Sequence, residues 1–298
     1  MTSAILRMAA AILMGAAASS AAAQPGVTAE GTEFVMRTPE GQVLRSADLV
    51  GATLTLRTEE GETEVTIQSA EEDGRANGGR VWLHRFTVPG ADGRPYDLCK
   101  PDAQGLSAGF PLPEEHGGLV ITCTSGAIGK CVRWGYRFWE EHEGGPPLRA
   151  LHRACVHLAR ADYGGDGRPA TRPGVTIHVC DRFDIRPCRE DAPLAFEAAW
   201  GPEGAICIAH PRVAELITLH ELAMRVPRLR DRIGPEACSE ATARTDRSAL
   251  LLSRSANTRA RGQSPALSWS VGRPAGINRP LKKALPSGVP YHFRRKER

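Results

Sequence analysis

Five side chains near the middle of the sequence have the chemistry of an acid–base site. They are three carboxylates, a phenol and an imidazole, at Asp162, Tyr163, Asp166, Glu197 and His210. A carboxylate and an imidazole within reach of each other can transfer a proton or bind a metal ion. A hairpin around residues 201–204 would place Glu197 and His210 diagonally on one face. We favour a solvent-facing surface pair for these two residues. A secreted hydrolase-type enzyme built from the larger set is the alternative.

The segment 162–167 resembles the first half of a calcium loop. It has acids at loop positions 1 and 5 and glycine at position 6. Gly164 occupies position 3, and Pro173 occupies position 12, where a calcium loop needs a bidentate glutamate. An Asp-capped turn leaving a helix explains the same residues, because its carboxylates accept backbone N–H groups. We favour the turn and predict no metal site.

Three other catalytic patterns are incomplete. His220 and Glu221 match half of the metalloprotease motif His-Glu-x-x-His, but Met224 stands where the second histidine is required. Cys155 and His152 are three residues apart and could meet on a helix. However, Cys155 lies on an expected apolar stripe, so we favour a structural role over a thiol nucleophile. The sequence has no dinucleotide fingerprint, Walker A loop or nucleophile elbow. We therefore predict no small-molecule cofactor.

Residues 1–23 have the three parts of a secretory signal peptide. A single Arg7 precedes an apolar stretch, and Ala21–Ala23 supply small residues before a cleavage site, with Gln24 as the new start. No apolar run after this segment is long enough to span a bilayer. The sequence therefore predicts an exported protein, periplasmic or extracellular, without a transmembrane segment after cleavage.

The chain contains eight cysteines, and in an exported protein an even number indicates disulfides rather than free thiols. The candidates are Cys99, Cys123, Cys131, Cys155, Cys180, Cys188, Cys207 and Cys238. Eight cysteines allow 105 pairings, and the sequence leaves them open. A local Cys123–Cys131 bridge is one candidate, because Gly126 and Gly129 let the chain double back. The C-x7-C spacing does not match a zinc knuckle, so we predict no zinc site.

Charge is concentrated at the C-terminus. Residues 257–298 hold ten Lys/Arg and one acid, a net +9, whereas residues 24–256 carry −6. The tail is rich in Arg, Ser, Pro and Gly, which is typical of disorder. It could contact an anionic component of the cell envelope or be a solvated extension, and we weigh these equally. The sequence gives no sign of a specific nucleic-acid site.

The remaining chain predicts an α+β fold with many turns, since Gly and Pro number 31 and 22. Alternating residues in 54–56, 65–67 and 81–88 indicate antiparallel strands. A helix is expected from Pro146 to about Asp162, and further helices over 213–225 and 235–252. Strands are expected at 175–180, 194–200 and 205–210. In the last hairpin, a four-residue loop would place Phe196, Ala198 and Trp200 on the face of Ala205, Cys207 and Ala209.

Several strings resemble the ADYC-domain family of exported bacterial proteins, named for an Ala-Asp-Tyr-Cys signature. They lie at 123–136, at 152–155, at 161–167 and in the hairpin 195–207. The signature reads Ala161-Asp-Tyr-Gly164 here, so glycine replaces the fourth cysteine, and Cys180 is a candidate for partial compensation. The resemblance implies a family but no activity.

These observations predict four regions. They are a signal peptide over 1–23, a β-rich N-terminal region over 24–122, a mixed, disulfide-bridged ADYC-like domain over 123–256, and a basic disordered tail over 257–298. Because no catalytic constellation is complete, we expect a non-enzymatic exported module with a binding or structural role.

Overall fold

A computed structural model describes residues 26–58, 61–115, 118–189, 194–256 and 292–294. The predicted signal peptide and most of the predicted tail lie outside these residues. Within the described ranges, no helix has the length and apolar content needed to cross a bilayer. The fold is α+β with β structure dominant, as the sequence predicts.

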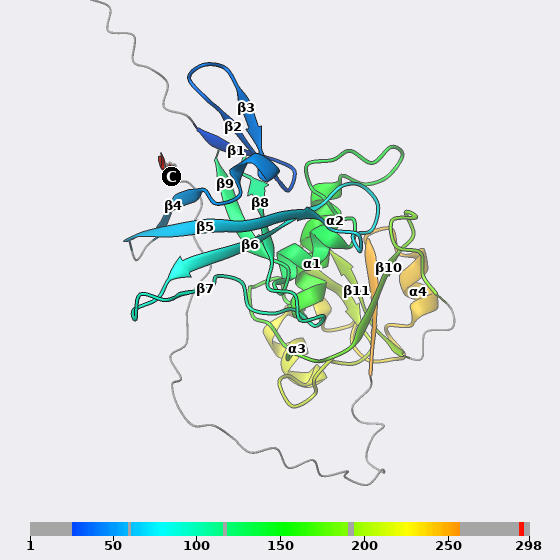
Figure 1. The fold of residues 1–298 in the computed structure, drawn as a ribbon. Helices are drawn as coiled ribbons and strands as arrows, with labels where there is room; N and C mark the ends of the chain where they lie inside the picture. The colour runs from blue at the N-terminus through cyan, green and yellow to red at the C-terminus, as the bar shows by residue number, and fades with distance from the viewer. Residues whose placement is uncertain (1–25, 59–60, 116–117, 190–193, 257–291, 295–298) are drawn as a thin grey trace, which may run out of the picture.

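The N-terminal half forms two antiparallel sheets, and the larger one also includes a short strand near the C-terminus (Figure 1). A three-stranded sheet is formed by β1 (Val27–Glu30), β2 (Glu33–Arg37) and β3 (Val43–Arg45), followed by the 3-10 helix η1 (Ser46–Leu49). The seven-stranded sheet has the order β14-β4-β5-β6-β8-β9, with β7 paired to β6. Its strands are β4 (Thr53–Thr58), β5 (Gly61–Glu72), β6 (Trp82–Pro89), β7 (Pro95–Asp97), β8 (Gly109–Pro113), β9 (Leu119–Cys123) and β14 (His292–Arg294). The predicted hairpin is confirmed, with Leu54 opposite Val65.

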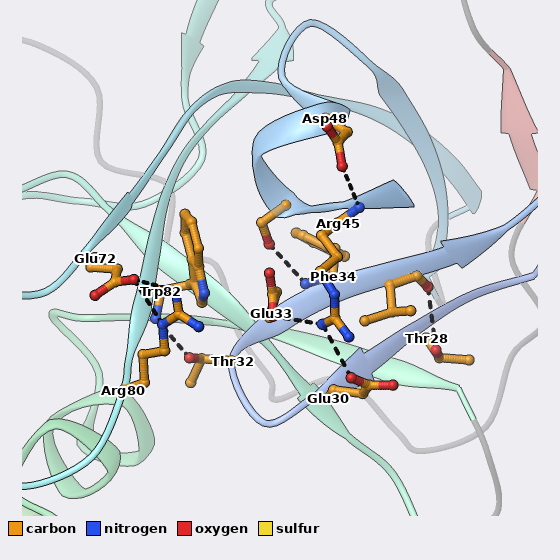
Figure 2. A network of polar contacts seen from close by, with 12 residues as sticks. Thr28, Glu30, Thr32, Glu33, Phe34, Arg45, Asp48, Glu72, Arg80 and Trp82 are labelled. Atoms are coloured by element: carbon orange, nitrogen blue, oxygen red, sulfur yellow. Dashed lines mark hydrogen bonds and ion pairs between the residues drawn. The ribbon is translucent and has the colours of Figure 1, made fainter. Parts of the chain in front are cut away.

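Polar contacts connect the small sheet to the large one (Figure 2). The N–H of Trp82 donates to Thr32 Oγ1 at 2.7 Å, which ties the β1–β2 turn to β6. On the surface, Arg45 pairs with Glu30 at 3.2 Å and with Glu33 at 2.8 Å. The part-buried Trp82–Thr32 contact joins the two sheets. The Arg45 ion pairs lie within the small sheet, and exposed pairs of this kind contribute little to stability.

His84 lies inside the core between these sheets. Its ring stacks on Phe86 and meets Phe34 edge-on, and Nε2 is 2.8 Å from Ser46 Oγ. The side chain is fully buried, and Nδ1 has no hydrogen-bond partner. Burial disfavours the charged imidazolium and lowers the pKa of His84 from 6.5 to about 4.

Acidification is therefore expected to destabilise the protein through His84. Between pH 6.5 and 4 the unfolded chain binds a proton at this residue that the folded chain does not bind. The free energy of unfolding should thus be highest above pH 6.5 and fall by about 3 kcal/mol by pH 4 from this residue alone. Urea unfolding from pH 7 to pH 4 measures the change. In His84→Gln, which cannot titrate, the decrease should be smaller by about that amount. Equal pH dependence in both proteins would contradict the prediction.

The C-terminal half contains a four-stranded antiparallel sheet with helices on both faces. Its strand order is β10-β13-β11-β12. The elements are α1 (Ala127–Arg133), α2 (Leu148–Arg160), β10 (Ile177–Asp181), β11 (Ala195–Gly201), β12 (Gly204–Ile208), α3 (Leu219–Arg225), η2 (Pro227–Leu229), α4 (Glu240–Thr245) and β13 (Leu251–Ser255). Leu151 and Leu158 of α2 pack with Trp200 on one face. Ala243 of α4 packs with Cys180 and Cys207 on the other.

Two of the helix predictions were too long. The helix expected over 213–225 begins only at Leu219, because Thr218 and Glu221 form a capping box there. The helix expected over 235–252 is limited to α4, capped by Ser239, and its last residues belong to β13. Packing of Leu251 and Leu252 against opposite faces of the sheet outweighs their helix propensity.

The predicted hairpin register is confirmed next to the turn, where Trp200 pairs with Ala205, and is wrong beyond a bulge. Ala199 pairs with Cys207, so Ile206 is an extra residue in β12. The extra residue reverses the face on which the following residues lie. Cys207 therefore packs with Ala199, and Trp200 faces α2.

All eight cysteines are paired. The bridges are Cys99–Cys123, Cys131–Cys155, Cys180–Cys188 and Cys207–Cys238. The local Cys123–Cys131 bridge is therefore wrong: Cys123 ends β9 and bonds back to the segment before β8, whereas Cys131 on α1 bonds to α2.

Candidate functional site

A phenol, a carboxylate and a guanidinium form one buried hydrogen-bond network in the C-terminal half. The Tyr163 hydroxyl donates to Glu197 Oε1 at 2.9 Å and accepts the backbone N–H of Arg212 at 2.7 Å. The Arg212 guanidinium contacts both carboxylate oxygens of Glu197, with Nε 3.1 Å from Oε2 and Nη2 3.0 Å from Oε1. We call Tyr163, Glu197 and Arg212 the buried triad.

The surroundings of the buried triad leave no face open to a ligand. The Glu197 and Arg212 side chains are 0% and 1% exposed. Arg212 also donates through Nη2 to the carbonyl of Leu158 and through Nη1 to the carbonyl of Ala159, both at the end of α2. Burial and the Glu197 charge raise the pKa of Tyr163 well above its ordinary value, so its hydroxyl stays protonated as a donor. The triad can join α2, β11 and the segment after β12, but it cannot contact a substrate.

This arrangement overturns the expectation that Glu197 is a surface residue paired with His210. The Glu197 side chain points to Tyr163 and Arg212. His210 contacts Glu197 through its backbone N–H at 3.4 Å, and its Nδ1 lies 3.1 Å from the carbonyl of Pro211. The bulge between residues 196 and 198, where β11 pairs with β13, explains why the simple alternation failed.

Asp162 caps the end of α2. Ala161 adopts a left-handed conformation with φ 49°, which ends the helix. Asp162 Oδ2 then accepts the N–H of Gly167 at 2.9 Å and lies 3.1 Å from His157 Nδ1. Burial would raise the pKa of Asp162, but these hydrogen bonds outweigh burial and hold the pKa below its ordinary value. The favoured Asp-capped turn is confirmed by this geometry.

The loop of residues 162–167 rests directly on the β11–β12 turn. A Cβ at Gly165 would lie only 2.3 Å from the carbonyl oxygen of Glu203. Arg228 closes this junction: its guanidinium donates to the carbonyls of Tyr163, Gly164, Glu203 and Ala205. A side chain at Gly165 would collide with the β11–β12 turn, and a side chain at Gly204 would collide with Arg228. The close packing of this junction therefore requires glycine at both positions.

Asp166 lies apart from the buried triad at the surface. It is 37% exposed and its Oδ2 lies 3.7 Å from both Arg168 Nε and Arg225 Nε. Of the hydrolase-type set, then, only Tyr163 and Glu197 bond to each other through their side chains, and they do so in the core. The other three make separate contacts in different places.

The five acid–base residues do not form a shared open pocket or a metal cluster in the described ranges. In the described part of the chain, no group of three or more His, Cys, Asp or Glu could hold a metal ion. One surface hollow, of about 620 Å³, is lined by Leu216, Ile217, His220, Glu221, Met224 and Arg225. Another, of about 320 Å³, lies along β5 and β6 and includes Arg85 and Asp97. Neither hollow includes any of the five predicted acid–base residues.

The structural role favoured for Cys155 is confirmed. Cys155 is bonded to Cys131 and is fully buried, and His152 Nδ1 lies 2.7 Å from the carbonyl of Tyr136. Cys180, the candidate for partial compensation of Gly164, is bonded to Cys188, and its compensating role stays a prediction. Since every cysteine has a partner, the glycine in the signature leaves no unpaired thiol.

Sequence reasoning missed Arg212 and Arg228. Each follows a proline, and no pattern distinguishes either from the many surface arginines. Only Arg212 had an indirect signal. Glu197 lies within a predicted hairpin, and a buried carboxylate at that position would need a cationic partner.

Comparison with known proteins gives one match. A family model described as the ADYC domain matches residues 46–214, more than half of the 298-residue chain. No curated protein matches the chain, and no solved structure matches it.

Proposed function

The chain belongs to the ADYC domain family, and from that premise we propose that it is an exported, non-enzymatic module with a binding or structural role. The buried triad is the observation that carries this proposal. Tyr163 of the signature and Glu197 of the hairpin form hydrogen bonds with each other and with Arg212, and these side chains are almost completely buried. Catalytic groups must reach the reacting atoms, and these cannot.

Export is supported by the cysteines and the first residues together. Four disulfides need an oxidising compartment to form and persist. Residues 1–23 have the composition of a cleavable signal. We assign the protein to the periplasm or the medium. For the basic tail, contact with an anionic component of the envelope and a solvated extension remain equally weighted proposals.

The intact mass of the protein purified from its natural host tests both parts. We expect a chain starting at Gln24 that takes up no alkylating reagent before reduction and eight equivalents after denaturation and reduction. Native mass spectrometry of the same sample then shows whether a ligand travels with the protein. A product that retains Met1 and has eight reactive thiols without reductant would falsify the export proposal.

A further inference from the structure

The hollow of about 620 Å³ beside α3 gathers exposed apolar side chains. Leu216 is 46% exposed and Met224 is 66% exposed, and between them Ile217 is buried in the core of the C-terminal half. Figure 1 shows α3 at the outer edge of this half. Exposed apolar side chains grouped around a hollow of this size are typical of a binding site for a small molecule.

The apolar part of the lining is aliphatic. Leu216, Ile217 and Met224 contribute branched or thioether side chains, and His220 is the only ring among the lining residues. Planar ligands are held best by aromatic side chains, whereas a methionine adapts its shape to a flexible apolar ligand. An alkyl chain therefore fits this lining better than an aromatic ring does.

Arg225 provides the positive charge of the hollow. Its Nε and Nη2 are buried and have no hydrogen-bond partner among the residues that the structure describes. Asp166 Oδ2 lies 3.7 Å from Arg225 Nε, which is beyond hydrogen-bond distance, and it lies 3.7 Å from Arg168 Nε as well. Two arginines thus share one carboxylate, and neither forms a side-chain hydrogen bond with it.

The acidic residue of the lining is already bound elsewhere. Glu221 Oε2 accepts the N–H of Thr218 at 2.7 Å and the Thr218 hydroxyl at 2.8 Å. These bonds hold the Glu221 carboxylate at the start of α3, where it caps the helix. Arg225, in the last turn of α3, is left with unused donors.

We propose that this hollow binds an aliphatic carboxylate, the anion of a fatty acid. Nε and Nη2 of one guanidinium form the edge that binds a carboxylate in a bidentate way, so the ligand would give Arg225 the two acceptors that it lacks. Asp166 is 37% exposed and rotates into solvent to admit the ligand. The alkyl chain then covers Leu216 and Met224.

The proposal rests on the binding role proposed above, for which it names a ligand. Its test measures binding alone, so its failure leaves the intact-mass test of export and disulfides unaffected.

Calorimetric titration of the purified, disulfide-bonded protein with sodium dodecanoate, kept below its critical micelle concentration, tests the proposal. We expect one saturable site. Dodecyltrimethylammonium, which has the same chain and the opposite charge, should bind at least about tenfold more weakly. Arg225→Gln should weaken dodecanoate binding by about tenfold or more and leave binding of the ammonium unchanged. The control Arg153→Gln changes an exposed arginine outside the hollow and should behave as the unaltered protein.

A second variant tests where the alkyl chain lies. Met224→Gln replaces the thioether with a polar group of similar length and should weaken binding of dodecanoate about fivefold. Because Met224 is 66% exposed, the circular dichroism spectrum should not change. The control Ile128→Gln changes an exposed apolar residue of α1, outside the hollow, and should leave binding unchanged.

Four results would overturn the proposal. They are the absence of saturable dodecanoate binding, equal affinity for the two amphiphiles, full affinity in Arg225→Gln or Met224→Gln, and binding only above the critical micelle concentration. The last result would show adsorption to a micelle rather than a site for one molecule.

Discussion

Replacing Arg212 with methionine is expected to lower the free energy of unfolding by about 4 kcal/mol, within the range of 3–5 for breaking a buried ion pair. The substitution leaves the Glu197 carboxylate in the core without its cation, while its side chain is 0% exposed. The carbonyls of Leu158 and Ala159 lose their donors as well. Denaturant unfolding at pH 7 with the disulfides intact measures the loss.

A surface arginine provides the matched control. Arg153 pairs with Glu203 at 2.7 Å, but the two side chains are 56% and 74% exposed. Arg153→Met should therefore cost less than about 1 kcal/mol. Combining Arg212→Met with Glu197→Gln removes the unpaired charge and should restore part of the stability. If Arg212→Met proved as mild as Arg153→Met, the buried triad would not be a structural brace.

The elements that followed from local patterns were predicted well. The hairpin of Leu54 and Val65 alternates apolar and polar residues, and that alternation determines which face is buried. The helix after Pro147 carries its apolar stripe at Leu151, Cys155 and Leu158, all fully buried. Both signals depend only on residues a few positions apart.

The predictions failed where distant segments decide the outcome. Ile206 is an extra residue in β12, and nothing in the hairpin sequence distinguishes this bulge from a regular ladder. A second bulge, between Phe196 and Ala198 where β11 pairs with β13, turns Glu197 into the core. Glu197 there contacts Tyr163, although its neighbours in the chain suggest a solvent-facing position. Its partner Arg212 lies fifteen residues later in the chain, and the two residues meet only because the tertiary fold brings their segments together.

The structure gives the signature residues a physical meaning. Ala161 supplies the left-handed residue that ends α2, Asp162 caps the following turn, and Tyr163 enters the buried triad. The first two residues shape the end of α2 and the turn after it, and Tyr163 joins that turn to β11 through Glu197. In this structure the signature therefore contributes to the docking of α2 on the sheet.

Removing the Cys131–Cys155 bridge by double substitution to alanine is expected to cost about 4 kcal/mol. In the chain-entropy model, a closed loop of this length contributes about 3.5 kcal/mol by restricting the unfolded chain. Both sulfurs are also fully buried where α1 meets α2, so their removal leaves a small void. Denaturant unfolding of the variant against the unaltered protein measures the loss.

The Cys180–Cys188 bridge is the informative comparison, because it closes a separation of 8 residues rather than 24. Loop length alone predicts about 2.5 kcal/mol for its removal, about 1 kcal/mol less than for the longer loop. Native contacts would increase the loss from removing the short bridge. Asp181, inside the short loop, accepts hydrogen bonds from the Tyr136 hydroxyl and from the N–H groups of Phe183 and Arg186. A greater loss from the short loop would show that this bridge holds a folded contact in place, and that restriction of the unfolded chain is the smaller effect.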